Sequence, residues 1–214
     1  SQLNNGIASM AKARKVDFIQ GNATFKSNSE VEVLNGKKKE SLSFDQCIVA
    51  AGSSSSMLPN VPKHKNILTS KTALDLESIP KSLLVIGGGV IGVELGQVYS
   101  TLGSKVSLVE FLPSIIPGAD QDIVKPLERK LKKQFDLIMM NSKVINIKET
   151  KNNLLSVTIE QESKSKTMDF EKILVAVGRK PNTDLLNLKA TSIAVNNQGF
   201  INVDQYQRTN VKSI

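Results

Sequence analysis

A glycine-rich turn between an apolar run and a helical pattern constrains this chain more than any other feature of its sequence. Residues 83–86 are all apolar, and residues 87–92 (GGGVIG) match the pattern G-x-G-x-x-G. A helical pattern follows and continues to about Leu102, where Gly103 marks its end. A continuous apolar run is typical of a strand that is buried on both faces. The sequence therefore predicts a strand, a tight turn and a helix, which together begin a β-α-β unit.

Each glycine of this turn has a separate expected role in binding a dinucleotide. Gly87 allows the tight turn, Gly89 lets a pyrophosphate approach the backbone, and Gly92 lets helix and strand pack closely. The helix that begins here directs its free N–H groups and the positive end of its dipole at the phosphates. The pattern predicts a phosphate-binding turn, and the alternative is a glycine-rich turn of some other α/β domain.

An acidic residue at the end of the next strand indicates which dinucleotide is bound. Residues 106–109 form a second apolar run, and Glu110 follows it, 18 residues after Gly92. At this position a carboxylate accepts a hydrogen bond from the ribose 2′-hydroxyl, whereas it repels a 2′-phosphate. Residues 111–118 contain no Lys or Arg that could receive such a phosphate. The sequence therefore favours NAD over NADP, and the alternative is an ordinary exposed Glu at a strand end.

Strands and helices alternate along the second half of the chain, which is typical of a parallel α/β sheet. After Glu110 we expect a helix at 120–134, strands at 137–140 and 143–148, a hairpin of 154–160 with 166–170, and a buried strand at 173–177. Before Pro80 we expect a helix at 2–15 and short strands at 16–20, 23–26, 30–34, 40–44 and 47–50, with a loop at 53–66. The expected fold class is α/β, with a Rossmann-like βαβ domain, a parallel sheet and a β-meander.

Composition excludes several other classes of protein. The net charge of +8 is diffuse, because residues 1–80 contribute 10 − 7 = +3 and residues 81–214 contribute 18 − 13 = +5. Only 4% of the residues are aromatic, so nucleic-acid binding is disfavoured. We expect no secretory signal and no membrane span, since no apolar run approaches roughly 20 residues. The single cysteine, Cys47, excludes a disulfide scaffold, a Cys-rich metal site is not expected, and a cytoplasmic location is the natural expectation.

The sequence resembles the flavoprotein disulfide reductases, also called the pyridine nucleotide-disulfide oxidoreductases, and among them the bacterial dihydrolipoamide dehydrogenases. The resemblance extends over nearly all of the chain. Its most specific stretches are residues 48–53 (IVAAGS), 69–74 (TSKTAL), 87–96 (GGGVIGVELG), 102–110, 116–120 (IPGAD), 175–183 (VAVGRKPNT), and 199–211.

The resemblance implies a division of the chain and a set of cofactor-binding residues. Residues 1–79 correspond to the middle segment of an FAD-binding domain, 80–197 to an NAD-binding domain, and 198–214 to the start of the return to the FAD domain. The residues implied to bind NAD are Gly87, Gly89, Val90, Ile91, Gly92, Glu94, Glu110, Val144, Ala176 and Gly178. Those implied to line FAD are Ala23, Ala51, Gly52 and Ser53.

Within these sets the resemblance assigns individual roles, and some residues have a plain structural alternative. Glu94 lies beside the nicotinamide, Glu110 holds the adenosine ribose, and Val144 flanks the adenine. The structural alternative is a core-strand or loop residue for Val144, Ala23 and Ser53. For Glu94 it is a surface or helix-capping residue. Ala51 departs from the Thr that is common at its position in the family.

Several motifs of the family have no counterpart in this sequence. These are the first FAD fingerprint, the redox-active cysteine pair, the Gly-Asp flavin motif and the C-terminal His-Glu pair. Cys47 is expected to be a small buried core residue, and His64 lies in a Pro- and Lys-containing loop. We therefore expect the NAD(H)-binding part of a dihydrolipoyl dehydrogenase, with no catalytic residue and no metal site of its own.

The implied partners belong to the parent enzyme. They are a second copy in a homodimer and the lipoyl-bearing subunit of a 2-oxo acid dehydrogenase complex. Two alternatives stay open from the sequence. One is a fragment of a related mercuric or glutathione reductase, and the other is a stand-alone nucleotide-binding module.

Overall fold

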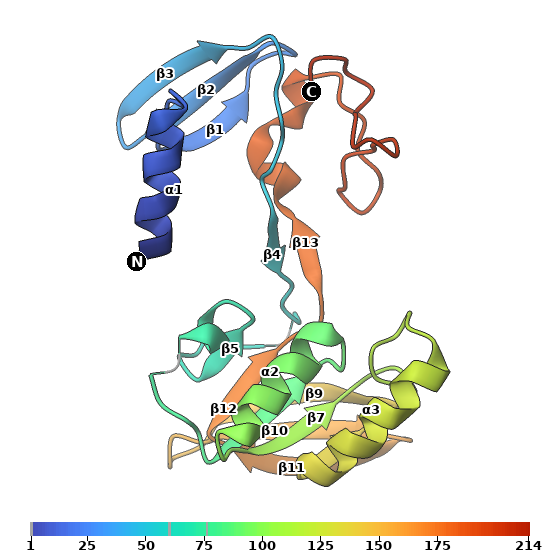
Figure 1. Cartoon of the computed structure of the whole chain (residues 1–214). Coiled ribbons are helices and arrows are strands. Elements are labelled where there is room, and N and C mark those ends of the chain that lie inside the picture. The colour runs from blue at the N-terminus through green and yellow to red at the C-terminus, as the bar shows by residue number, and fades with distance from the viewer. Residues whose placement is uncertain (1, 60, 76) are drawn as a thin grey trace. The chain divides into compact units, whose positions relative to one another are not determined.

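The computed structural model describes residues 2–59, 61–75 and 77–214, and it divides the chain into two compact units. One unit contains the chain up to Gly52 together with Pro181–Ile214, and the other is Ser53–Lys180 (Figure 1). The second unit carries the glycine-rich turn and is described first. No helix of the described residues is long and apolar enough to cross a membrane.

A five-stranded parallel sheet forms the centre of the unit Ser53–Lys180. Its strands lie in the order β5-β12-β6-β7-β8. Their bounds are β5 (Ile67–Thr69), β12 (Lys172–Val175), β6 (Ser82–Ile86), β7 (Lys105–Val109) and β8 (Leu137–Met139). The predicted α/β class and parallel sheet are confirmed, whereas β5 was not expected, because no strand was predicted at residues 67–69.

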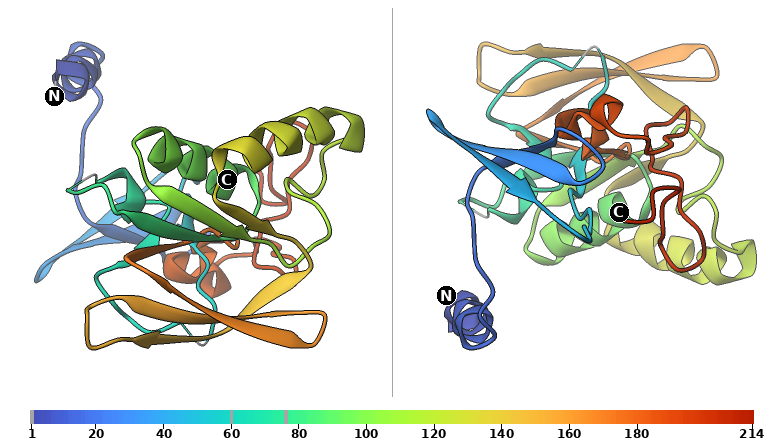
Figure 2. Two further views of the ribbon diagram at one scale, coloured as in Figure 1. Left: turned by 90° about the horizontal axis from the view of Figure 1, so that it is seen from below. Right: turned by 90° about the horizontal axis from the view of Figure 1, so that it is seen from above.

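Helices cover one face of this sheet and an antiparallel meander covers the other (Figures 1 and 2). The helices are α2 (Val90–Thr101) and α3 (Gln121–Gln134). The meander consists of β9 (Ser142–Glu149), β10 (Leu155–Gln161) and β11 (Lys164–Phe170). The β10–β11 turn contains only Glu162 and Ser163, both with positive φ, which is the geometry of a tight hairpin.

Strand β6 shows why the central run has to be apolar at every position. Leu83 and Val85 belong to the core cluster that contains Val93 of α2, whereas Leu84 and Ile86 belong to the cluster on the meander side. Successive side chains of a strand point to opposite faces, so a strand between two layers buries all of them. The four side chains are 0–4% exposed.

The other unit contains a helix and a small antiparallel sheet. The elements are α1 (Gln2–Ala13), β1 (Asn22–Phe25), β2 (Glu30–Asn35) and β3 (Lys38–Ser43). The strands pair in the order β1-β2-β3, and Gly36 has a φ of +59° in the β2–β3 turn. The later part of the unit contains the short 3-10 helices Asn182–Leu186 and Leu188–Ala190.

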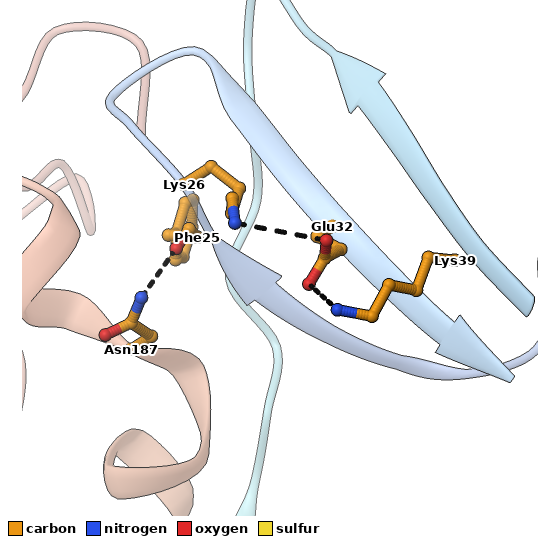
Figure 3. Close-up of polar contacts among 5 residues, drawn as sticks. All are labelled: Phe25, Lys26, Glu32, Lys39 and Asn187. Atoms are coloured by element: carbon orange, nitrogen blue, oxygen red, sulfur yellow. Dashed lines mark hydrogen bonds and ion pairs between the residues drawn. The ribbon is translucent and has the colours of Figure 1, made fainter. Parts of the chain in front are cut away.

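Polar contacts join parts of this unit that are distant in sequence (Figure 3). The side chain of Asn187 donates a hydrogen bond from Nδ2 to the carbonyl oxygen of Phe25, at 3.0 Å. Asn187 has a φ of +53°, which Asn tolerates better than most residues. On the sheet, Glu32 forms ion pairs with Lys26 at 3.9 Å and with Lys39 at 3.6 Å. The Asn187 hydrogen bond therefore attaches the C-terminal segment of the unit to β1, whereas the ion pairs of Glu32 lie within the sheet region itself.

Two predicted strands are wrong, since neither residues 16–20 nor residues 47–50 form a strand. Ile48 is 93% exposed, and Cys47 is half-buried with its N–H donating to the carbonyl of Ser213 at 2.7 Å. An apolar run becomes a buried strand only where other strands pair with it, and none of the described strands does so here. The partial burial of Cys47 raises the pKa of its thiol.

The ends of other elements also differ from the sequence-based expectation. The segment expected to be a loop contains β4 (Ser53–Ser55), which pairs with β13 (Arg179–Pro181). The expected strand at 173–177 ends at Val175, where the chain turns toward Gly178. Strand ends depend on the position of neighbouring strands, which a local pattern does not contain.

Tyr99 gives a pH-dependent test of the helix packing in the larger unit. Its side chain is 2% exposed, and its hydroxyl donates a hydrogen bond to the carbonyl oxygen of Ala73 at 2.8 Å. Burial raises the pKa of Tyr99 above the ordinary value of 10.0. We expect Tyr99→Phe to lower the free energy of unfolding by about 1–2 kcal/mol, because the Ala73 carbonyl loses its donor.

The difference in the free energy of unfolding between wild type and Tyr99→Phe should become smaller at high pH. A raised pKa in the folded state stabilises the fold fully below the unfolded-state pKa, and this stabilisation is lost as pH rises through the folded-state pKa. Urea unfolding from about pH 7 to about pH 11 measures this difference. If the difference in the free energy of unfolding stays constant over that range, the raised pKa of the buried Tyr99 hydroxyl is contradicted.

Candidate functional site

A cavity of about 700 Å³ lies in the unit Ser53–Lys180, at the carboxyl ends of the central strands. The last residues of three of these strands line it, namely Ile86 of β6, Val109 of β7 and Val175 of β12. Its volume is within the range of small-molecule sites. In open parallel sheets, ligands bind at the carboxyl ends of the strands, so this edge is the expected place for a site.

Gly87 directly follows β6 and lines the cavity, and its surroundings leave no space for a side chain. Its φ is +105°, and a Cβ at this position would lie 2.4 Å from the carbonyl oxygen of Ala176. Its N–H donates to the carbonyl of Val109 at 2.8 Å. The turn therefore packs directly against the ends of both neighbouring strands, β7 and the β12 segment, and needs glycine there.

Gly89 and Gly92 differ in what surrounds them. A Cβ on Gly92 would lie 2.0 Å from the carbonyl oxygen of Gly87, so the first turn of α2 packs against the backbone of the turn itself. Gly89 is the N-terminal cap residue of α2, lines the cavity, and has nothing within 4 Å of the position of its Cβ. The open space beside Gly89 lies next to the N-terminus of α2, where an anion is stabilised.

The carboxylate of Glu110 is held against the glycine turn. One oxygen, Oε2, accepts a hydrogen bond from the N–H of Gly88 at 2.5 Å, and Oε1 accepts one from the N–H of Leu112 at 2.7 Å. The residue is 8% exposed and lines the cavity. A carboxylate has about four acceptor positions, so Glu110 can still accept a hydrogen bond from a ligand.

Most of the residues predicted to bind NAD lie around this one cavity. The lining includes Gly87, Gly89, Val90, Ile91, Glu110, Val144, Ala176 and Gly178. Gly92 does not line it and packs inside the turn. Glu94 does not line it either, because its side chain is exposed on α2 beside a shallow hollow that includes Lys130 and Gln134. The position of Glu94 beside a nicotinamide stays a prediction.

The residues predicted to line FAD do not line this cavity. Ala23 is exposed on β1. In the same unit, the backbone oxygens of Ala51 and Gly52 accept hydrogen bonds from Asn182, at 2.9 Å from its Nδ2 and 3.1 Å from its N–H. Ser53, in the larger unit, accepts a hydrogen bond from Nε of Arg179 at 2.7 Å. Their FAD-binding role stays a prediction.

Sequence reasoning missed one wall of the cavity. Ser55, Leu58 and Ser70 line it, although their segments carry no local pattern that indicates a site. Arg179 holds this wall, because it donates to the backbone oxygen of Ser53 and from Nη1 to Oγ of Ser70 at 3.1 Å. The hydroxyls of Ser55 and Ser70 lie 3.0 Å apart. The available signals were the two stretches of family resemblance at 69–74 and 175–183, neither of which had been assigned to this wall.

Lys143 also lines the cavity and was not expected there. It lies on β9, directly after Ser142, whose N–H donates to the backbone oxygen of Glu110 at 2.9 Å. The search for a basic residue near Glu110 covered only the residues that follow it in sequence. A cation that reaches the same cavity from a separate strand could not be found in that way.

Together, the parallel sheet, the glycine turn and the carboxylate at its edge define an α/β protein of the Rossmann-like dinucleotide-binding class. The family model described as "Pyridine nucleotide-disulphide oxidoreductase" matches residues 1–214. The chain belongs to this family, and the predicted family resemblance is confirmed.

Individual relatives agree with this assignment. The chain is 40% identical over 216 residues to "Dihydrolipoyl dehydrogenase" of Vibrio cholerae serotype O1, with 100% of this chain and 45% of that protein covered. It is 38% identical over 215 residues to the protein of the same name from Buchnera aphidicola subsp. Schizaphis graminum, with the same coverage. The chain thus spans slightly less than half the length of these relatives.

A solved structure shares the fold. The HOCl-induced flavoprotein disulfide reductase RclA from Escherichia coli, in its Cu(II) complex, matches with a TM-score of 0.86 and 27% identity. The match covers 98% of this chain and 47% of that one.

Replacing Gly92 and Gly89 separately by Ala should show which of the two is needed for packing of the turn. We expect Gly92→Ala to lower the free energy of unfolding by about 2–3 kcal/mol or more, because its methyl group meets the carbonyl of Gly87. Gly89→Ala is the matched control, with open space and an ordinary φ of −69°, and should cost only about 0.5–1 kcal/mol, the loss expected when Ala replaces Gly at an N-terminal cap. Thermal unfolding measures both, and equal losses contradict the packing role of Gly92.

Proposed function

We propose that this chain provides the NAD(H)-binding site of a flavoprotein of the dihydrolipoyl dehydrogenase type. The parent enzyme would reoxidise dihydrolipoamide of a 2-oxo acid dehydrogenase complex, with FAD and NAD supplying the hydride-transfer chemistry. The observation that carries the proposal is the position of Glu110, whose carboxylate is buried against the N–H of Gly88 at the edge of the cavity. A neutral ribose hydroxyl satisfies this acceptor, and a 2′-phosphate does not.

We assign the residues around the cavity to successive parts of a bound dinucleotide. Gly89 and the N-terminus of α2 would receive the pyrophosphate, because no side chain occupies the space beside Gly89. Glu110 would accept from the adenosine ribose, and Val144 would pack against the adenine. Ala176 and Gly178 would lie toward the nicotinamide end. When bound, the nicotinamide supplies the hydride chemistry, and this chain positions it.

The remaining family roles are part of the same proposal. Residues 1–79 and 198–214 would belong to an FAD-binding domain, and residues 80–197 would form the NAD-binding domain. Ala23, Ala51, Gly52 and Ser53 would line FAD, and Glu94 would lie beside the nicotinamide. The redox cysteine pair and the His-Glu base would come from parts of the parent protein that this sequence does not contain, since Cys47 is its single cysteine. The homodimer, the lipoyl-bearing partner and the cytoplasmic location are likewise proposed for the parent.

Two other functions compete with this one. A fragment of a different flavoprotein disulfide reductase, such as a mercuric or glutathione reductase, would share the fold and the glycine turn. A stand-alone nucleotide-binding module would bind the same ligand and have no flavin partner. The names of the relatives that are 38–40% identical to the chain favour the dihydrolipoyl dehydrogenase type.

Binding of reduced dinucleotides tests the proposed site directly. We expect the chain to bind NADH at least about tenfold more tightly than NADPH, because Glu110 repels a 2′-phosphate. Gly89→Ala should weaken NADH binding by about tenfold, since its methyl group enters the space for the pyrophosphate. Gly6→Ala in α1, which also has open space, is the control and should leave affinity unchanged. Fluorescence titration measures these values, and equal affinity for NADH and NADPH contradicts the proposal.

A measurement of dihydrolipoamide turnover tests whether this chain acts as a complete enzyme or only as its NAD(H)-binding part. We expect no reduction of NAD by dihydrolipoamide with this 214-residue chain, with or without added FAD, because the chain has one cysteine and the reaction needs a pair. Absorbance of NADH measures the reaction, and a full-length dihydrolipoyl dehydrogenase is the positive control. Turnover by the chain alone would overturn the assignment of its chemistry to residues outside it.

A further inference from the structure

A lysine side chain belongs to the lining of the cavity that Glu110 also lines. Lys143 lines it, and Ser142, the residue before, donates its N–H to the backbone oxygen of Glu110 at 2.9 Å. Strand β9 thus brings a lysine to the lining of the same cavity as the carboxylate that is proposed to hold the adenosine ribose. A site that only rejects a 2′-phosphate has no need of a lysine here, so its role requires a separate explanation.

Lys143 is restrained by an ion pair across the meander. Its Nζ lies 2.7 Å from Oε1 of Glu160, the residue that faces it on β10. The side chains are 51% and 33% exposed, respectively. Exposed pairs of this kind are weak, and a lysine side chain has a flexible four-carbon stem. The ammonium group can therefore leave Glu160 when a stronger anion enters the cavity.

Glu110 is restrained more firmly than Lys143. Both of its carboxylate oxygens accept backbone N–H groups, from Gly88 and from Leu112, and the residue is almost fully buried. A carboxylate held by two backbone donors cannot turn away from an incoming phosphate without leaving those donors unpaired. The carboxylate of Glu110 therefore keeps its position, whereas the ammonium group of Lys143 can move.

We propose that Lys143 is a second specificity residue of the dinucleotide site and that Glu160 controls it. In this proposal, which rests on the proposed function, the preference for NAD over NADP has two sources. The fixed carboxylate of Glu110 repels a 2′-phosphate, and the ion pair with Glu160 weakens the attraction that Lys143 would otherwise exert on it. Loss of either carboxylate shifts the site toward 2′-phosphorylated nucleotides, with Lys143 as the receiving cation.

The test compares NADH and NADPH affinities of the full 214-residue chain and its variants by fluorescence titration or calorimetry. We expect Glu160→Gln to raise NADPH affinity by about threefold with NADH affinity unchanged, in line with the strength of an exposed pair. Glu110→Gln should raise the ratio of NADPH to NADH affinity by about tenfold. Adding Lys143→Met to Glu110→Gln should remove most of that gain.

Lys148→Met is the matched control, because Lys148 lies on the same strand and does not line the cavity. It should leave the NADPH-to-NADH ratio unchanged in every background. The effect of Lys143 should also decrease at high ionic strength, since screening weakens a partly exposed charge interaction.

The outcomes separate this inference from the proposed function. Failure of the wild-type chain to bind NADH contradicts the proposed function itself. Normal NADH binding, together with a NADPH affinity that neither Glu160→Gln nor Lys143→Met alters, overturns the inference and leaves the proposed function in place. If Glu110→Gln lowers the melting temperature enough to prevent binding, competition by 2′,5′-ADP against 5′-ADP in the Glu160→Gln and Lys143→Met variants decides the question.

Discussion

The close approach of α2 to the end of β6 is the constraint on which the rest of the larger unit depends. A Cβ on Gly92 would lie 2.0 Å from the carbonyl oxygen of Gly87, so the helix begins directly over the turn. This approach lets Val93 reach the apolar cluster beneath the helix, where Leu83 and Val85 also lie. It also leaves the N-terminus of α2 at the open edge of the sheet, next to the cavity. The packing of the helix and the position of its N-terminus beside the cavity therefore have the same structural origin in two glycines.

The sequence predicted those parts of the fold whose cause is local. The run that became β6 is apolar because both of its faces are covered, and the glycines after it are required by contacts with adjacent backbone. Residues 47–50 have an equally apolar pattern, yet Ile48 is 93% exposed, because no described strand pairs with this segment. A hydrophobic pattern records what a strand would bury, whereas the strands beside it determine whether it is buried.

In the candidate site, too, residues with a local sequence signal could be predicted and residues placed by distant segments could not. The position of Glu110 at the cavity could be predicted because it follows from a fixed spacing from the glycine turn within one β-α-β unit. Lys143 and Ser70 could not, since they reach the cavity from segments whose position depends on the meander and on the Arg179 hydrogen bonds. The argument for NAD from the absence of a basic residue after Glu110 was correct about the sequence. It was incomplete about the cavity, because Lys143 of β9 is among the residues that line it.

The wall formed by Ser55, Leu58 and Ser70 shows that the glycine turn alone does not enclose the cavity. These residues precede the β-α-β unit in sequence, and Arg179, after the last strand of the sheet, donates hydrogen bonds to Ser53 and Ser70. The guanidinium group thus joins the segment before the sheet to the segment after it, with a planar set of donors that a lysine does not have. The β-α-β unit supplies the glycine turn and the carboxylate of Glu110. Closing the cavity requires both flanking segments, so the shape of the site depends on contacts made across most of the unit Ser53–Lys180.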